Sequence, residues 1–268
     1  MKFCSINGQQ QTKIAINDRG LSYGDGLFTT AKIAAGKVML LAKHVERLID
    51  GCQKLKIPLP DDVNLTQELS QVAQPYASAV LKVMITAGSG GRGYSRLGLK
   101  DNATNIIITV TDFPTNYAEI ARTGINMGNS EQQLASSSML GGIKHLNRLE
   151  QVLLKAEVDE RSEDDLIVTN VLGNVVEAIS SNVFYWLDGQ LYTPEISTSG
   201  VNGIIRQVII EKNPQINIVK TKLSELKQVQ SMFICNALMG IIPVKTYNEQ
   251  QLNLTPVIML QQEMKGLL

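Results

Sequence analysis

The stretch GGIKHLNRLEQVLLKAEV, residues 141–158, frames the interpretation of this chain. From Leu146 onward its apolar residues recur at helical spacing, which predicts an amphipathic helix with one buried face. Those apolar residues are Leu149, Val152, Leu153 and Ala156. Lys144 lies between a glycine pair and the start of this helix, at the predicted edge of a core. A lysine in that place is either a solvated charge with a buried stem or a nucleophile held in a pocket.

The composition narrows the class of protein. The 268 residues, 44% of them hydrophobic, are enough for one large domain or two smaller ones. Twenty-five basic and 25 acidic residues balance, and without a basic block or stripe we expect no nucleic-acid surface. The first ten residues lack a signal-peptide core, and no apolar run approaches the ~20 residues that span a bilayer. We therefore expect a cytoplasmic protein with no membrane contact.

The cysteines and histidines predict neither disulfides nor a metal site. Cys4, Cys52 and Cys235 are an odd, scattered set without CxxC spacing, so neither a disulfide framework nor a zinc site is indicated. The chain has only two histidines, His44 and His145, so we expect no histidine-rich metal centre.

The segments around the opening stretch predict an α+β fold. The expected strands lie within residues 26–42, 79–88, 104–113 and 231–244, and the expected hairpins over 165–178 and 183–194. The expected helices cover residues 42–57, the run after 203 and the run after 255. Residues 114–119, PTNYAE, have the composition of a connector. We therefore predict two domains, residues 1–115 and 120–268, with a ligand in the cleft between them.

The glycine-rich segment GSGGRG, residues 88–93, follows a predicted strand and fits the literal GxGxxG pattern. A dinucleotide site also needs a helix that opens at this loop and an acidic residue about twenty positions further on. The next residues, YSRLGLKDNAT, lack helical periodicity, so we do not expect that fold. Two interpretations remain, a plain surface loop or a binding loop in which Arg92 meets a carboxylate.

Glu177 and Arg47 are each either a residue of a binding site or an ordinary surface residue. Glu177 lies in the apolar strand pattern NVVEA, just before a run of hydrogen-bonding residues. It is either a buried carboxylate that needs a cationic partner or an edge-strand glutamate that faces water. Arg47, in HVERL, is either a phosphate ligand or an ordinary arginine on a helix surface.

Gly203 precedes the helical run that starts at Ile204 and Ile205. The unpaired N–H groups and dipole of a helix start form an anion site, although most such loops are simply turns. Together with Lys144, the acid and the arginine, this site would supply the parts that hold pyridoxal phosphate.

Seven motifs in order over nearly the whole chain carry a family resemblance: DRGLSYGDGLFTTAKI, KHVERL, GSGGRGYS, GIKHLNRLEQVLLKAE, EAISSNVFY, GVNGIIRQ and CNALMGIIPV. Together they resemble the branched-chain and D-amino-acid aminotransferase superfamily, the fold-type IV pyridoxal-phosphate enzymes. Within it, GSGGRGYS, IKHLNRLEQ and CNALM resemble the aminodeoxychorismate lyases. The resemblance implies a two-domain fold with the cofactor in the cleft, and a homodimer.

The resemblance also implies roles for individual residues. Lys144 would be the Schiff-base lysine and proton-transfer base, Glu177 would contact the pyridine nitrogen, and Arg47 would hold the phosphate. Further cofactor contacts would come from Ser181, Asn182, Gly203, Asn236 and Ala237, and from the backbone amides of Ile204 and Ile205. Thr29 or Thr30 would donate a proton to the leaving group, and Arg92 and Tyr94 would bind a substrate carboxylate.

The implied reaction converts 4-amino-4-deoxychorismate to p-aminobenzoate and pyruvate in folate biosynthesis. Two positions depart from the wider superfamily, since Ile205 replaces a common threonine and Asn236-Ala237 replaces Gly-Thr. The chain also lacks the Arg-x-His carboxylate trap of the D-amino-acid enzymes, which counts against transamination. The alternatives are a D- or branched-chain amino-acid aminotransferase and, more remotely, a binding protein without activity on the same fold.

Overall fold

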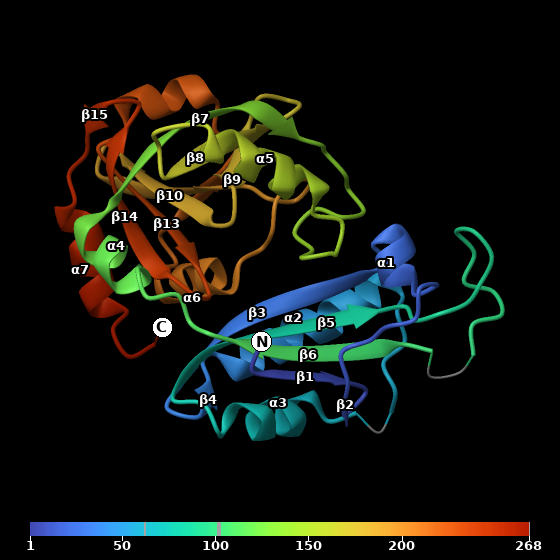
Figure 1. Cartoon of the computed structure of the whole chain (residues 1–268). Helices are drawn as coiled ribbons and strands as arrows, with labels where there is room; N and C mark the ends of the chain where they lie inside the picture. The colour runs from blue at the N-terminus through green and yellow to red at the C-terminus, as the bar shows by residue number, and fades with distance from the viewer. Residues whose placement is uncertain (62, 101–102, 268) are drawn as a thin grey trace. The chain divides into compact units, whose positions relative to one another are not determined.

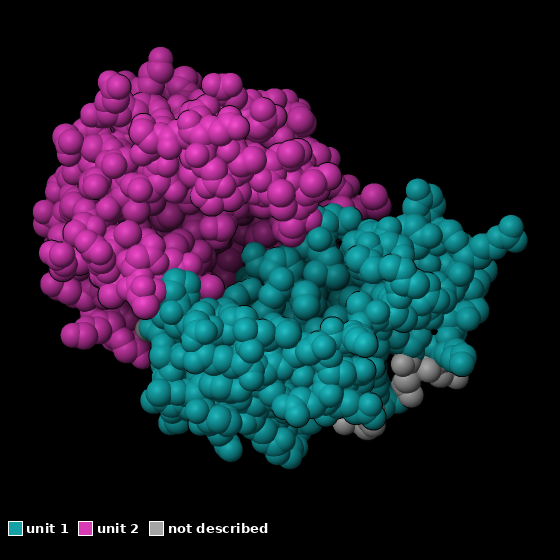
Figure 2. Space-filling model, viewed as in Figure 1, with its two compact units in different colours: residues 1–114, 144–147 teal, residues 115–143, 148–268 magenta. Residues whose placement is uncertain are grey.

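A computed structural model describes residues 1–61, 63–100 and 103–267. The chain forms two compact α+β units, each with its own sheet (Figure 1). The first unit comprises residues 1–114 and 144–147, and the second comprises residues 115–143 and 148–268, as coloured in Figure 2. The segment Lys144–Asn147 therefore belongs to the first unit, whereas the predicted domain limits placed it in the second.

The first unit contains a six-stranded antiparallel sheet in the order β2-β1-β6-β5-β3-β4. The strands are β1 (Phe3–Ile6), β2 (Gln9–Gln10), β3 (Gly26–Ala34), β4 (Lys37–Val38), β5 (Ser78–Thr86) and β6 (Asn105–Thr111). The helices are α1 (Arg19–Tyr23), α2 (Leu41–Leu55) and α3 (Leu65–Ala73). The strands and the helix predicted in this part of the chain are confirmed.

Strand β3 shows how this sheet separates its two faces. Leu27, Ala31 and Ile33 are buried in the core that the sheet shares with α2 and α3, while Phe28 and Thr30 are only half-buried. This alternation follows from the period of two along a strand. One face of β3 is therefore part of the core, and the other is only half-buried.

The second unit contains a nine-stranded mixed sheet in the order β12-β11-β10-β13-β14-β7-β8-β9, with β15 paired to β14. The strands are β7 (Ile125–Leu134), β8 (Asp165–Asn170), β9 (Val175–Ala178), β10 (Asn182–Leu187), β11 (Gln190–Pro194), β12 (Asn217–Val219), β13 (Ser231–Asn236), β14 (Gly240–Tyr247) and β15 (Gln250–Gln251). The helices are α4 (Tyr117–Thr123), α5 (Leu149–Asp159), α6 (Ile204–Lys212), the 3₁₀ helix η1 (Leu223–Gln228) and α7 (Thr255–Glu263).

Both predicted hairpins are present. Strands β8 and β9 pair antiparallel, as do β10 and β11. The turn between β10 and β11 places Asp188 at φ 49° and Gly189 at φ 75°, the two positive angles of a type I′ turn. The Asp-Gly pair is therefore the local reason for this hairpin.

Two predictions about helices are wrong. Helix α4 begins at Tyr117, inside the segment predicted to be a connector. Helix α5 begins only at Leu149, and its predicted buried face is exposed: Leu149, Val152 and Leu153 are each more than half exposed. The side of α5 that the core covers is the one that carries Leu154 and Val158. Helical spacing identifies an apolar stripe, but it does not tell which stripe the core covers.

Candidate active site

Lys144 is attached to strand β3 through backbone hydrogen bonds. The Phe28 N–H donates to the Lys144 carbonyl at 2.9 Å, and the Leu146 N–H donates to the Gly26 carbonyl at 2.9 Å. Leu27 and His145 form an antiparallel bridge between these bonds. The lysine therefore lies on a short strand-like segment beside β3, and the helix that was expected to follow it directly begins five residues later.

Glycines next to β3 make room for this segment. A Cβ at Gly24 would lie 2.3 Å from Asn147 Oδ1, and a Cβ at Gly26 would lie 2.7 Å from Leu146 Cδ1. Asn147 also donates from Nδ2 to the Gly24 carbonyl at 3.1 Å. The motif GDG therefore allows the close approach of the chain that carries the lysine.

The Lys144 ammonium lies over an aromatic ring. Its Nζ is 4.7 Å from the centroid of Phe28, and the Nζ of Lys82 is 5.0 Å from the same centroid. Such cation–π contacts attract an ammonium group to the face of an aromatic ring. Phe28 belongs to the half-buried face of β3, so this is the face of the first unit on which the lysine amine lies.

The structure separates the two predicted proton donors Thr29 and Thr30. Thr29 is fully buried, and its Oγ1 is 2.6 Å from Nδ1 of His44 on α2. Thr30 has the opposite orientation, on the same half-buried face as Phe28. The Thr29 hydroxyl therefore belongs to the packing of β3 on α2, and the prediction is narrowed to Thr30.

His44 is a neutral histidine. Burial, followed by the charge of Arg47, lowers the pKa of His44 to about 3. Arg47 lies one helical turn further along α2 and is half-buried. Burial lowers the pKa of the Arg47 guanidinium to about 10, so it stays protonated at neutral pH. A partly desolvated guanidinium of this kind is suited to a phosphate.

In the second unit, Glu177 is buried in β9 with 5% of its surface exposed, so the water-facing interpretation is wrong. The Val201 N–H donates to its Oε2 at 2.9 Å. Gly200 has φ +77°, and a Cβ there would lie 2.6 Å from Val176 Cγ1 and 3.0 Å from Glu177 Oε2. A side chain at position 200 would therefore collide with the strand that carries the acid.

The charge of Glu177 acts on two arginines of the second unit, the half-buried Arg148 and the buried Arg206. Burial lowers the pKa of Arg148, while the charges of Glu177 and Glu150 act to raise it. Burial also lowers the pKa of Arg206, against the raising effect of Cys235 and Glu177. The acid is thus compensated electrostatically within its own unit, as a buried carboxylate requires.

The start of α6 is shaped by Asn182. This side chain donates from Nδ2 to the Val201 carbonyl at 2.8 Å and accepts from the Gly203 N–H at 3.1 Å. A Cβ at Gly203 would lie 2.0 Å from Asn182 Oδ1, so glycine is required there. Among the described residues no side chain caps α6, and the first N–H groups of a helix have no partner within the helix. The amides of Ile204 and Ile205 are therefore suited to an anion.

Ser181 and Asn236 contact one another. Asn236 donates from Nδ2 to Ser181 Oγ at 3.1 Å, and its Oδ1 accepts from the N–H groups of Leu238 and Met239 at 3.0 and 2.9 Å. The Asn236 amide thus shapes the turn that contains Ala237. The Asn236-Ala237 turn, at the position where the wider superfamily has Gly-Thr, is therefore held by the Asn236 side chain.

These groups fit pyridoxal phosphate by their chemistry. Gly200, beside Glu177, and Gly203, at the start of α6, lie where there is no room for a side chain. Residues 200–204 connect the buried acid to the free end of the helix that carries the amides. Considered by itself, the first unit carries an amine at Lys144 and a guanidinium at Arg47. This set contains partners for an aldehyde, a ring nitrogen and a phosphate.

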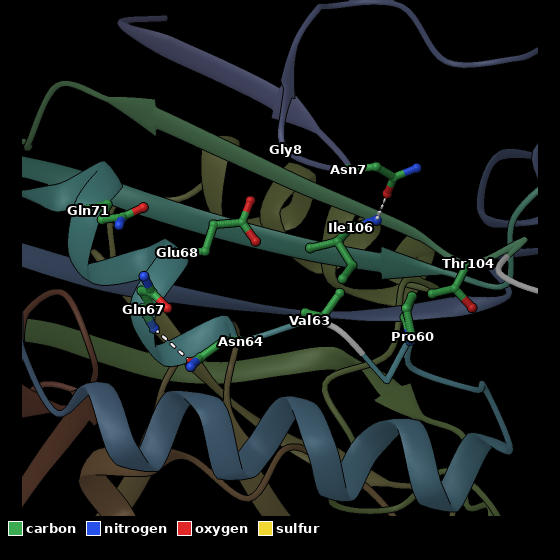
Figure 3. Close-up of a pocket in the computed structure, with 10 residues that line it drawn as sticks. All are labelled: Asn7, Gly8, Pro60, Val63, Asn64, Gln67, Glu68, Gln71, Thr104 and Ile106. Carbon is green, nitrogen blue, oxygen red and sulfur yellow. Dashed lines mark hydrogen bonds between the residues drawn. The ribbon is translucent and has the colours of Figure 1, made fainter.

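A pocket in the first unit is not this site. It has a volume of about 440 Å³ and is lined by Asn7, Gly8, Pro60, Val63, Asn64, Gln67, Glu68, Gln71, Thr104 and Ile106 (Figure 3). These lining residues include neither a lysine nor an arginine, and none of the predicted site residues. Among the described residues that line it, the pocket therefore offers no cationic partner for a phosphate.

Arg92 and Tyr94 lie in an exposed loop, and 89% of the Tyr94 surface is accessible. The sequence did not indicate that Arg19, Asp25 and Arg96 hold this loop. Arg19 follows Asp18, whose side chain accepts from the Gly20 N–H and caps α1, but a helix cap of this kind carries no information about the loop.

The amino-transferase class IV family matches residues 26–247, and the chain belongs to this family. An aminodeoxychorismate lyase from Vibrio harveyi is 33% identical over 243 residues, which cover 89% of each protein. The crystal structure of 4-amino-4-deoxychorismate lyase from Pseudomonas aeruginosa superimposes with a TM-score of 0.90 at 32% identity, over 99% of this chain and 100% of that one. A putative branched-chain-amino-acid aminotransferase from Methanocaldococcus jannaschii is 28% identical over 88% of this chain and 83% of that protein.

Proposed function

We propose that this protein is a pyridoxal-phosphate-dependent lyase that converts 4-amino-4-deoxychorismate to p-aminobenzoate and pyruvate. The observation that carries the proposal is the amine of Lys144, attached to β3 and oriented by Phe28. Two lyases that are more than 30% identical to this chain over most of its length support the choice of reaction. Atoms balance without another reactant, because the two products together have the composition of the substrate.

The cofactor, when bound, supplies an electrophilic aldehyde carbon and a ring that accepts electrons. Lys144 would hold that carbon through its amine until the substrate amine takes its place, and the freed lysine would then remove the proton at C4 of the substrate. Glu177 would hold the proton on the ring nitrogen. Arg47 and the amides of Ile204 and Ile205 would bind the phosphate.

The remaining predicted residues have supporting roles in this proposal. Asn182, Gly203 and the pair Ser181–Asn236 would shape the loops that surround the phosphate, next to Ala237. Thr30, on the same face of β3 as Phe28, would donate a proton to the departing pyruvate. Arg92 and Tyr94 would bind a substrate carboxylate.

The direct test is to supply 4-amino-4-deoxychorismate with pyridoxal phosphate and to quantify both products. We expect p-aminobenzoate and pyruvate in equal amounts, and neither from Lys144→Ala. Borohydride reduction of the cofactor-loaded protein should label the peptide that contains Lys144. A label on another lysine would refute this assignment.

An aminotransferase is the second candidate, favoured by the similarity to a putative branched-chain enzyme. The same assay separates the two functions. Amino-group exchange between a D- or branched-chain amino acid and a keto acid, without p-aminobenzoate, would establish the aminotransferase.

We further propose a cytoplasmic homodimer. The exposed apolar stripe of α5, Leu149, Val152 and Leu153, supports an interface on the second unit, because a patch of this kind is typical of a contact surface. Cys4, Cys52 and Cys235 are free thiols, and thiols persist in a reducing compartment. Among the described residues, no helix has the length and apolarity needed to cross a membrane. Light scattering should give twice the chain mass, and Leu153→Glu should reduce it.

A further inference from the structure

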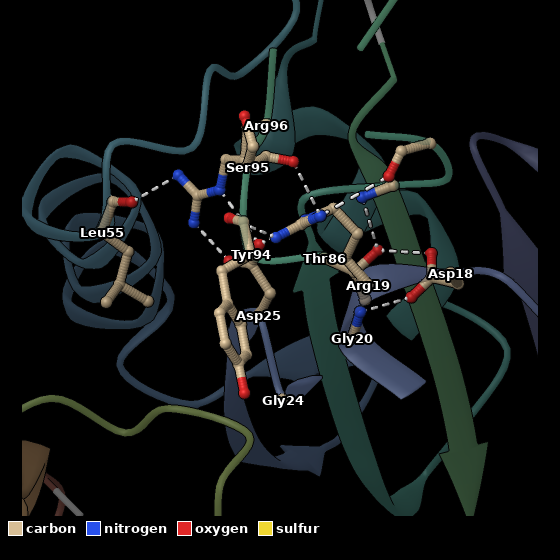
Figure 4. A network of polar contacts seen from close by, with 12 residues as sticks. Asp18, Arg19, Gly20, Gly24, Asp25, Leu55, Thr86, Tyr94, Ser95 and Arg96 are labelled. Carbon is tan, nitrogen blue, oxygen red and sulfur yellow. Dashed lines mark hydrogen bonds and ion pairs between the residues drawn. The ribbon is translucent and has the colours of Figure 1, made fainter. Parts of the chain in front are cut away.

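The buried guanidinium of Arg19 binds several backbone carbonyls of the glycine-rich loop. Only 4% of the Arg19 side chain is exposed. Its Nη1 donates to the carbonyls of Gly93 and Ser95 at 3.0 and 3.2 Å, and its Nη2 donates to that of Tyr94 at 3.0 Å (Figure 4). Three consecutive carbonyls of an exposed loop therefore converge on one side chain.

Asp25 connects this guanidinium to a second one. The Arg19 Nε donates to Asp25 Oδ2 at 2.8 Å, and the Arg96 Nε donates to the same oxygen at 3.0 Å. Arg96 Nη2 also pairs with Asp25 Oδ1. Burial raises the pKa of Asp25, but its hydrogen bonds with Arg96 and Arg19 outweigh this effect, so the pKa lies below its usual value. The carboxylate is therefore ionised between two cations.

Arg96 anchors the far side of the loop to α2. Its Nη1 donates to the carbonyls of Leu55 and Lys56, each at 2.8 Å, where α2 ends. Carbonyls at the end of a helix have no later helical N–H to accept from, so the Arg96 guanidinium acts as a C-terminal cap. The three residues Arg19, Asp25 and Arg96, here called the clamp, thus tie the loop to α1, to the start of β3 and to α2.

Further close contacts join the loop to the clamp and to α1. Gly91 has φ +75°, and a Cβ there would lie 2.3 Å from the Ser95 carbonyl and 3.1 Å from Arg19 Nη1. The Tyr94 ring contacts Tyr23 of α1, with 5.5 Å between centroids, and Arg19 lies 4.9 Å from the Tyr23 ring. The loop carbonyls therefore face inward, while the side chains of Arg92 and Tyr94 remain exposed.

We propose that Arg19, Asp25 and Arg96 are positioning residues that order the 88–98 loop in the free protein, so that Arg92 and Tyr94 are presented to an anionic substrate. The inference rests on the proposed function, whose substrate carries two carboxylates. Ordering a loop during binding costs conformational entropy, and a loop that is ordered beforehand avoids that cost. The clamp is thus expected to act on substrate affinity and not on the chemical step.

The decisive variant is Arg96→Gln, because Arg96 is the more exposed of the two arginines and its loss spares the buried Arg19–Asp25 pair. We expect faster hydrogen exchange at the amides of residues 90–96 and unchanged exchange in β5 and β6. We expect KM to rise roughly tenfold, with kcat within about a factor of two, because the ion pair with Asp25 and the bonds to the Leu55 and Lys56 carbonyls are lost outside the reacting centre. Cofactor affinity should not change.

Two further variants control this result. Lys54→Gln removes the same charge from an exposed position at the end of α2, and it should alter neither exchange nor KM. Arg96→Lys keeps the positive charge but lacks the planar guanidinium, so its KM should lie between those of the wild type and Arg96→Gln.

Unchanged exchange in Arg96→Gln would refute the clamp. Faster exchange with an unchanged KM, or with a fall in kcat alone, would refute its positioning role. If the wild type had no lyase activity, the proposed function would fail, but exchange would still decide the clamp. Titration with p-aminobenzoate, which presents a carboxylate without turnover, would then decide the positioning role, and equal affinity in wild type and variant would refute it.

Discussion

Replacement of Thr29 and Thr30 by valine, one at a time, should separate stability from catalysis. Valine matches threonine in shape but lacks the hydroxyl. In Thr29→Val, the buried Nδ1 of His44 loses the Oγ1 that lies 2.6 Å away. Both partners are fully enclosed and His44 is neutral, so the cost is that of one unsatisfied neutral group, about 1–3 kcal/mol.

Thr30→Val should have the opposite effect. Thr30 lies on the half-buried face of β3, where substitutions away from special contacts change stability by about 0.5 kcal/mol or less. If its hydroxyl donates a proton to the departing pyruvate, kcat should fall by about 10²-fold, as is typical of a lost general acid. Thr29→Val should keep kcat within a factor of about two.

Urea denaturation measures the first effect, and release of p-aminobenzoate under saturating substrate measures the second. The reasoning is refuted if Thr29→Val lowers kcat without a loss of stability, since Thr29 would then act on the reaction. It is also refuted if both variants retain full turnover, because Thr30 would then have no role in proton transfer.

Three other predictions follow from the same geometry. Glu177→Gln keeps an acceptor for the Val201 N–H, so it should bind cofactor while most turnover is lost; unchanged turnover would exclude Glu177 as the ring-nitrogen partner. Arg47→Gln should weaken cofactor affinity by roughly 10–100-fold in a fluorescence titration, and unaltered affinity would make Arg47 a surface residue. The unfolded chain binds a proton at His44 below pH about 6.5, but the folded protein does so only near pH 3. Stability should therefore decline by about 2 kcal/mol between pH 7 and pH 5, and His44→Asn should abolish that part of the slope.

Features that depend on local patterns could be predicted from the sequence. The Asp188-Gly189 turn specified a hairpin, and the periodicity of residues 42–57 specified a helix whose buried face includes Leu48 and Cys52. The candidate Glu177 could be found because it interrupts a local apolar pattern, and the candidate Lys144 because it lies between a glycine pair and a predicted helix. In these cases the deciding interactions lie between residues close together in the chain.

Features that depend on distant contacts could not be predicted. The bonds that join Lys144 to β3 connect residues far apart in the sequence, so local patterns placed it in the wrong unit. The period of two along β3 separates Thr29 from Thr30, but only the position of α2 shows which of them is buried. Arg19 satisfies backbone carbonyls, which any residue offers, so its role has no sequence signature.

The attachment of Lys144 to β3 has a consequence for the order of synthesis. The ribosome releases residues 1–114 well before residues 144–147, so the first unit lacks its final segment until part of the second has been made. Until then the Phe28 N–H has no Lys144 carbonyl to bind, and the edge of β3 is open to other chains. A nascent protein arrested before residue 144 would therefore have a nearly complete first sheet, no Lys144 amine and an unprotected strand edge, so we expect its tendency to aggregate to be greatest in this interval.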